Sequence, residues 1–253
     1  MMAYMAQSIT DIDRMPRGGP NASCLDRLLQ TDRLEYLDRD DVDDKVKRSV
    51  IRALEWTGEF FGNTEKFARI VLDEVADVPD PKILELGSGH GGLSRKLLEW
   101  HPTAELTVTD IETQSVAAIA GELGEHPRAT VREMDATAID APDGHFDLAV
   151  FTFSFHHLPP PLASRVFAEG TRAAAKLVII DLPRPPSPLH IVRLATMLPL
   201  APVVPFVHDG VISSLRCYSP SALRALAAHA DPAIEVELRN GLFSPQVAVA
   251  RRG

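Results

Sequence analysis

The chain has 253 residues, of which 45% are apolar and 24% are charged, so it holds enough apolar surface to build a folded core. Acidic side chains outnumber basic ones by 35 to 26, and the formal charge is −9. No block rich in lysine or arginine occurs, which argues against a protein that binds the nucleic-acid backbone.

Cysteines and apolar runs limit the class of protein further. Cys24 and Cys217 form neither a disulfide framework nor a zinc-ligand spacing, so we expect no metal site and a reducing, cytoplasmic compartment. The uncharged run at 194–207 is interrupted by prolines and is too short to cross a bilayer, so no membrane partner is expected.

The first part of the chain is predicted to be helical after a flexible arm. Prolines and glycines interrupt residues 1–22. Ser23 then offers an N-cap, and apolar residues recur at helical spacing across 41–61 and again after Thr64. We therefore expect a helical cap over residues 23–77.

Short apolar runs then alternate with segments of helical character. This alternation predicts parallel βαβ units in a Rossmann-like, doubly wound α/β sheet, with ligands at the carboxyl edge of the strands. The predicted strands are 82–86, 106–109, 130–132, 146–151 and 177–180, and the predicted helices are 91–100, 112–124 and 160–174.

The chain ends in a different pattern. Residues 234–238 alternate between apolar and polar, and Asn240 and Gly241 separate them from the run at 242–250, so we expect a hairpin that closes the sheet with an antiparallel strand. Before it, residues 183–217 form a proline-rich insertion. This insertion either covers the ligand or is a surface crossover.

Glycines cluster directly after the first predicted strand. A strand that enters a glycine-rich turn and then a helix brings backbone N–H groups close to a ligand. Gly87, Gly89 and Gly92 satisfy G-x-G-x-x-G, a dinucleotide pattern that is weak alone. Glu85 and Gly91 extend the loop to a second pattern, E-x-G-x-G-x-G.

Two carboxylates follow at the ends of the next two predicted strands. Asp110 can accept hydrogen bonds from both ribose hydroxyls of an adenosine. Asp135 can accept from an adenine amine, and its alternative role is that of a loop or capping residue.

Together these features resemble the class I S-adenosylmethionine-dependent methyltransferases over about residues 82–182. The resemblance implies a seven-stranded sheet with an antiparallel last strand, an N-terminal helical cap, an insertion after strand 5, and S-adenosylmethionine as cofactor. The motifs that carry it are Glu85-Leu86-Gly87-Ser88-Gly89-His90-Gly91, Asp110, Asp135, and Phe146-Asp147-Leu148-Ala149-Val150 leading to His156-His157-Leu158.

The resemblance also implies a set of cofactor-binding residues. The glycine loop would hold the methionine end, Asp110 the ribose and Asp135 the adenine amine, with Ile111 against the adenine ring. The full set is Glu85, Gly87, Ser88, Gly89, Gly91, Asp110, Ile111, Asp135, Ala136, Phe151 and Thr152.

Methyl transfer to a hydroxyl needs a base, and His156 and His157 are the candidates. The resemblance is greatest to small-molecule methyltransferases of quinone biosynthesis and of bacterial polyketide and secondary metabolism. The expected function is therefore O- or C-methylation of a phenolic, quinone-like or polyketide acceptor. His208 and Asp209 either reach the substrate or form a turn. The oligomeric state stays open, with a homodimer as one option.

Other functions stay open at this point. A non-catalytic methyltransferase-fold binding protein would keep the same cofactor residues. An NAD-binding oxidoreductase of the short-chain type would need Tyr-x-x-x-Lys, which none of Tyr4, Tyr36 and Tyr218 provides. DNA methyltransferases would need other residues after the fourth strand or a Pro-Cys pair, whereas protein substrates have no single signature.

The predicted domain organisation follows from these patterns. It consists of a flexible arm at 1–22, the cap at 23–77, and an S-adenosylmethionine-binding domain at 78–253 that contains the insertion 183–217.

Overall fold

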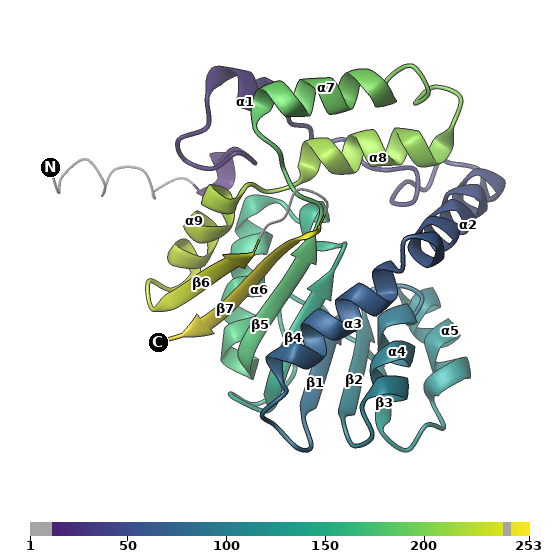
Figure 1. Ribbon diagram of the computed structural model, residues 1–253, viewed down its shortest axis with the longest axis vertical. Coiled ribbons are helices and arrows are strands. Elements are labelled where there is room, and N and C mark those ends of the chain that lie inside the picture. Colours follow the sequence, from purple (N-terminus) through teal and green to yellow (C-terminus); the bar gives the residue numbers. More distant parts are fainter. Residues whose placement is uncertain (1–11, 240–243) are drawn as a thin grey trace, which may run out of the picture. The chain divides into compact units, whose positions relative to one another are not determined.

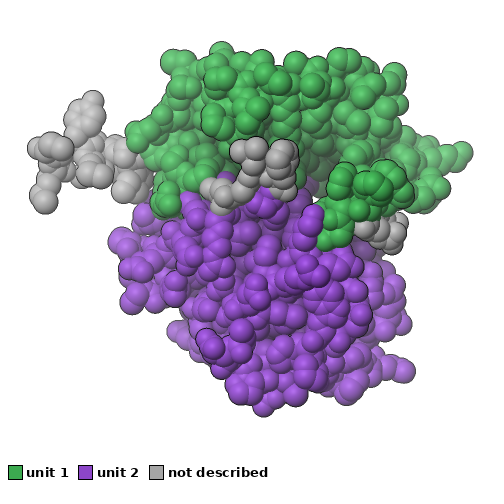
Figure 2. Space-filling view, viewed as in Figure 1, with its two compact units in different colours: residues 1–63, 182–225 green, residues 64–181, 226–253 purple. Residues whose placement is uncertain are grey.

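The computed structural model describes residues 12–239 and 244–253. The chain divides into two compact units, coloured separately in Figure 2. Within the described residues, unit 1 comprises 12–63 and 182–225, and unit 2 comprises 64–181, 226–239 and 244–253. The predicted turn at Asn240 and Gly241 lies outside the described residues. Across the described ranges, no helix has the length and apolar content needed to cross a membrane.

Unit 2 is built on a seven-stranded sheet of order β3-β2-β1-β4-β5-β7-β6 (Figure 1). Strands β1 to β5 pair in parallel, and β7 runs antiparallel to both of its neighbours. This confirms the predicted α/β fold and its antiparallel last strand. The strands are β1 (Lys82–Leu86), β2 (Glu105–Asp110), β3 (Ala129–Glu133), β4 (Phe146–Thr152), β5 (Ala174–Asp181), β6 (Ile234–Arg239) and β7 (Gln246–Arg252).

Helices cover both faces of this sheet. On one face, Leu97 and Ile119 belong to a buried cluster with alternate strand residues such as Ile83. On the other face, Phe167 packs its ring against Phe155 at 5.6 Å between centroids. The helices are α3 (Asn63–Glu74), α4 (Gly92–Trp100) and α5 (Thr113–Leu123) on the first face and α6 (Pro160–Ala173) on the second, with the short 3₁₀ helix η2 (Phe155–His157) after β4. Helix α9 (Pro220–Ala230) begins in unit 1 and ends in unit 2.

Helix α3 belongs to unit 2, although the sequence predicts it within the N-terminal cap. Its inward face, formed by Phe67, Ala68 and Val71, is buried in the same cluster as the first sheet face. Burial of these side chains joins residues 64–74 to the sheet.

Unit 1 is helical. Its elements are the 3₁₀ helix η1 (Ile12–Arg14), α1 (Cys24–Leu28), α2 (Asp44–Phe60), α7 (Ser187–Met197) and α8 (Pro205–Arg216). Ser23 caps α1 as predicted, since its side chain accepts the Asp26 N–H at 3.1 Å. Helix α8 contacts both α2 and α7, so the insertion packs on the N-terminal segment.

A buried arginine holds these two segments of unit 1 together. Arg184, from the insertion, donates from Nε and Nη2 to Oδ1 of Asp26 at 3.0 and 2.7 Å. The same guanidinium donates to the carbonyls of Leu29 and Cys217 at 2.8 and 3.3 Å. A charge this buried is tolerated because its donors find acceptors.

Residues 16–19 are buried in unit 1, although the sequence predicts a flexible arm there. The Gly18 carbonyl accepts from Ser219 Oγ at 2.7 Å, and the Arg17 guanidinium lies 4.4 Å from the Tyr218 ring centroid. These partners are far away in sequence, so the local pattern of proline and glycine does not reveal them.

Candidate functional site

The glycine loop joins β1 to α4 along a backbone path that favours glycine. Gly87, Gly89 and Gly91 have φ angles of 60, 56 and 68°. At Gly87 an added Cβ would lie 2.6 Å from Cε2 of Phe151, so a side chain clashes there. At Gly89 an added Cβ would meet nothing within 4 Å, so the loop leaves open space at this residue.

Asp110 fastens this loop to the end of β2. Its Oδ2 accepts the Gly89 N–H at 2.8 Å and its Oδ1 accepts the Glu112 N–H at 2.9 Å. The Ser88 N–H also donates to the Thr109 carbonyl at 2.9 Å. Each carboxylate oxygen has a second lone pair, so Asp110 can still accept from a ligand.

Two further features of this edge suit the binding of a ligand. The Ser88 hydroxyl is buried and has no hydrogen-bond partner among the described residues. Burial of a hydroxyl without a hydrogen-bond partner costs free energy, and a hydrogen bond to a ligand or to water would remove this cost. Beside Asp110, Ile111 is 62% exposed and presents an apolar surface.

The side chain of Glu85 is bonded to α4. Glu85 is fully buried, and Oε2 accepts a hydrogen bond from Ser94 Oγ. Burial raises the pKa of Glu85 to about 7, and the Ser94 hydrogen bond opposes this rise. The carboxyl group that the sequence predicts at the ligand thus has a partner within the protein.

Asp135 lies in the exposed segment after β3. Its Oδ1 accepts both the backbone N–H and the hydroxyl of Thr137, each at 2.8 Å. The preceding residue, Met134, donates its N–H to the Asp110 carbonyl at 3.0 Å, and Ala136 is half-buried. Asp135 therefore acts as a turn residue, and its Oδ2 forms no hydrogen bond within the described chain.

The end of β4 carries a strained residue. Phe153 has a φ of 51°, which is unfavourable for a bulky side chain, and its N–H donates to the Ile180 carbonyl at 2.9 Å. Phe151 is buried with its ring edge-on to Phe155, so it offers only backbone to a ligand, while Thr152 is half-buried.

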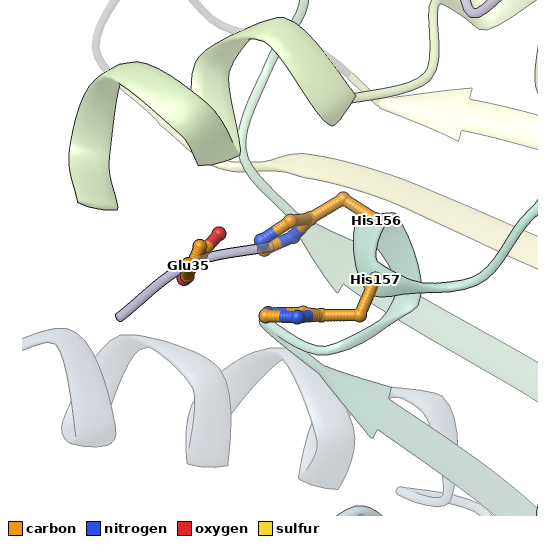
Figure 3. A group of neighbouring side chains, drawn as sticks. All are labelled: Glu35, His156 and His157. Atoms are coloured by element: carbon orange, nitrogen blue, oxygen red, sulfur yellow. The ribbon is translucent and has the colours of Figure 1, made fainter. Parts of the chain in front are cut away.

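His156 and His157 follow in η2 with their rings side by side, 4.4 Å apart between centroids (Figure 3). His156 is buried, and its Nδ1 lies 2.7 Å from Oδ1 of Asp181 at the end of β5. Its backbone N–H donates to the other oxygen of Asp181 at 2.9 Å. Glu35, also labelled in Figure 3, belongs to unit 1, where it accepts from Ser213 Oγ at 2.6 Å.

Two partners of the predicted site residues were missing from the sequence prediction. Asp181 ends a predicted strand next to β4, so the argument that selects Asp110 and Asp135 applies to it equally. Ser94 lies one helical turn into α4, and no local signal in the sequence points to its bond with Glu85.

Comparison with known proteins identifies the fold. Residues 83–176 match the family model of a methyltransferase domain. Over 196 residues the chain is 29% identical to the demethylmenaquinone methyltransferase of Thermus thermophilus, which covers 70% of this chain and 86% of that relative. Residues 83–176 are thus a methyltransferase domain, and the findings support a class I S-adenosylmethionine-dependent methyltransferase. The dinucleotide interpretation of its glycine loop is thereby set aside.

Other relatives of this methyltransferase match over shorter or more divergent stretches. The malonyl-[acyl-carrier protein] O-methyltransferase of Geobacter sulfurreducens is 33% identical over 98 residues, which are 39% of this chain and 36% of that relative. The plantazolicin methyltransferase BamL shares the fold with a TM-score of 0.62 at 11% identity, covering 85% of this chain and 91% of that one. Human N-acetylserotonin methyltransferase aligns with a TM-score of 0.59 at 18% identity, covering 90% and 65%.

Proposed function

We propose that this methyltransferase transfers the methyl group of S-adenosylmethionine to a small-molecule acceptor that is phenolic, quinone-like or a polyketide, by O- or C-methylation. The observation that carries the proposal is the hydrogen bond from the Gly89 N–H to Asp110. This bond places a carboxylate that could accept from ribose hydroxyls beside a glycine with open space around it.

The residues at this edge fit the cofactor. Asp110 would accept from the ribose, Ile111 would pack on the adenine, and the unpartnered Ser88 hydroxyl would find a partner in the ligand. Asp135 would use Oδ2 for the adenine amine. Glu85, bonded to Ser94, would position the loop.

The other predicted cofactor residues would act through their backbone or line the site. Their side chains are absent, buried or half-buried, and the backbone of Phe151 and Thr152 would face the amino-acid moiety of the cofactor. They are Gly87, Gly91, Ala136, Phe151 and Thr152.

The cofactor supplies an activated methyl group, so the protein mainly aligns the acceptor and removes its proton. We assign proton removal to His156. Asp181 holds Nδ1, and an imidazole with its proton on Nδ1 carries a basic lone pair on Nε2. His157, half-buried beside it, would line the acceptor site. An acceptor carbon that is already activated would not need this base.

The names of two relatives support a quinone-like acceptor. Besides the demethylmenaquinone methyltransferase, the 2-phytyl-1,4-naphtoquinone methyltransferase of Synechococcus elongatus is 25% identical over 134 residues, covering 51% of this chain and 58% of that one. Both names refer to a quinone.

The proposal is tested by incubating the full chain with S-adenosylmethionine labelled in the methyl group and a panel of naphthoquinols, phenols and polyketide-like diketones. We expect label in at least one small molecule, and less label with His156→Ala if the product is an O-methyl ether. A chain that binds the cofactor and labels none of the panel, but labels protein or RNA, would contradict the proposal.

A further inference from the structure

An uncharged apolar surface covers helix α7 and the turn that joins it to α8, both in unit 1 (Figure 1). Val192, on α7, is 60% exposed, and Val203, in the turn, is 75% exposed. Among the exposed side chains between residues 186 and 204 (the α7 surface), only that of Thr196 is polar, and the others are proline, alanine, valine, leucine and isoleucine. An exposed apolar surface of this kind marks a site of interaction.

Helix α7 is apolar toward the inside of unit 1 as well. Its inner side buries Leu194 in a cluster with Ala201 and Val211. A helix that is apolar on both sides is ordinarily buried in a protein core or in lipid, whereas the outer side of α7 is exposed. Although the formal charge of the protein is −9, no aspartate or glutamate occurs between Asp181 and Asp209.

The hydrogen-bond donors of the turn are all used within the chain. The Thr196 hydroxyl donates to the Arg193 carbonyl at 2.7 Å, inside the helix. Residues 199, 202 and 205 are prolines and have no N–H. The other backbone N–H groups of the turn donate to the carbonyls of residues 194, 197 and 200, and they belong to Leu198, Leu200, Ala201, Val203 and Val204. The turn therefore leaves no donor unpaired when it leaves water.

This lack of free donors favours lipid over protein as the partner. Interfaces between proteins carry about one hydrogen bond per 100–200 Å². A second copy of this chain would bring the same surface without free donors. The boundary between headgroups and acyl chains of a membrane needs no hydrogen bond from the apolar side of a helix.

Arg193 supplies the charge that suits a phospholipid. It is half-buried on α7, and its guanidinium forms no ion pair or hydrogen bond within the described part of the chain. A guanidinium can pair with a phosphate group while its aliphatic stem stays on apolar surface.

We propose that the α7 surface binds a phospholipid membrane, with the turn at the acyl chains and Arg193 at the phosphates. Residues 194–207 are too short to cross a bilayer, and for this reason the sequence predicts no membrane partner. Contact with one leaflet does not need that length. Together with the proposed function, this surface indicates a lipid-soluble, quinone-like acceptor. That step rests on the proposed function, whereas membrane binding does not.

The test measures flotation of the full chain, without a methyl donor, with phospholipid vesicles. One set of vesicles is phosphatidylcholine alone, and the other contains equal parts of phosphatidylcholine and phosphatidylglycerol. We expect binding that persists in high salt, because burial of apolar side chains does not depend on ionic strength. Absence of binding to both sets of vesicles, or complete release by salt, overturns the proposal.

Two variants and a control make the result specific. Val203→Asp places a charge at an exposed position of the turn, so the fold should be kept while vesicle binding falls roughly tenfold or more. Arg193→Gln should weaken binding about fivefold to the vesicles with phosphatidylglycerol and less to the others. Leu54→Asp, at an exposed leucine of α2, should bind like the unsubstituted chain. Equal losses in the two aspartate variants would contradict the site.

Light scattering without lipid tests the other partner. A chain that ignores vesicles but forms dimers, which Val203→Asp dissociates, assigns the α7 surface to a second copy and overturns the proposal. S-adenosylhomocysteine affinity, measured on the same samples, separates this inference from the proposed function. Cofactor binding without vesicle binding rejects only the inference, and vesicle binding without cofactor binding rejects only the proposed function.

Discussion

The Nδ1 atom of His156 lies 2.7 Å from Oδ1 of Asp181, and the other oxygen of that carboxylate accepts the His156 backbone N–H at 2.9 Å. Two hydrogen bonds to one aspartate therefore fix both the ring and the backbone of this histidine. The histidine is in η2, directly after β4, and the aspartate ends β5, the parallel neighbour of β4. Adjacent parallel strands thus bring together the proposed base and the carboxylate that orients it.

Asp181→Asn is expected to lower turnover with a hydroxyl acceptor by roughly 100-fold or more, because an amide donor facing Nδ1 favours the wrong histidine tautomer. The affinity for S-adenosylhomocysteine should stay within about twofold, since the loop at Gly89 is untouched. Single-turnover rates and calorimetry measure the two effects. Asp80→Asn, at an exposed aspartate before β1, is the control. Unchanged turnover in Asp181→Asn would remove His156 from the mechanism.

Two alanine substitutions in the glycine loop should separate stability from binding. Gly87→Ala adds a Cβ 2.6 Å from the Phe151 ring at a positive φ, so we expect a loss in unfolding free energy above the roughly 1–2 kcal/mol of left-handed strain alone. In Gly89→Ala the added Cβ meets no neighbour, so the loss in unfolding free energy should stay near the value for left-handed strain alone.

In Gly89→Ala the added methyl group enters the open space beside Asp110, so S-adenosylhomocysteine affinity should fall about tenfold or more. Urea denaturation and calorimetry on both variants provide the comparison. Full affinity in a folded Gly89→Ala variant would mean that the cofactor does not approach this part of the loop.

Glu85 predicts an unusual dependence of stability on pH. Its pKa is raised from 4.5 to about 7 by burial, so between these values the folded chain keeps a proton that the unfolded chain has lost. The free energy of unfolding therefore falls as pH rises through this window. The loss is nearly complete by about pH 8 and amounts to about 3 kcal/mol.

Glu85→Gln should remove this dependence while the amide keeps a hydrogen bond to Ser94. Urea denaturation at pH 5 and pH 8 measures the difference in unfolding free energy for each protein. Glu125→Gln, at an exposed glutamate after α5, should behave like the unsubstituted chain. If Glu85→Gln and the unsubstituted chain show the same difference between the two pH values, Glu85 ionises normally.

The sequence predicts the sheet and its edge well because both follow from local patterns. Alternating apolar runs mark β1 to β5, and a parallel sheet gathers Asp110 and the glycine loop at one edge. It also predicts His156 as a base, but the orienting carboxylate of Asp181 depends on which strands are neighbours. The bonds from Glu85 to Ser94 and from His208 to Asp209 depend on side-chain direction, which spacing alone does not determine.

Unit 1 shows a second limit of local patterns. Prolines and glycines before Ser23 predict a flexible arm, yet Arg17 and Gly18 are buried against residues near Tyr218. The insertion and the N-terminal segment pack through the ion pair of Arg184 and Asp26. These two residues are far apart in the sequence, so local patterns do not predict their contact. The proposed role of residues 183–217 in covering the acceptor stays a prediction.

Calorimetric titration of S-adenosylhomocysteine into the full chain and into Asp110→Ala tests the central claim most directly. We predict one binding site in the unsubstituted chain and a loss of about 1–3 kcal/mol in the variant, which is about five- to hundredfold in affinity. Asp80→Ala should bind like the unsubstituted chain. No binding to the unsubstituted chain, or equal affinity in Asp110→Ala, would contradict the assignment of the cofactor to this edge.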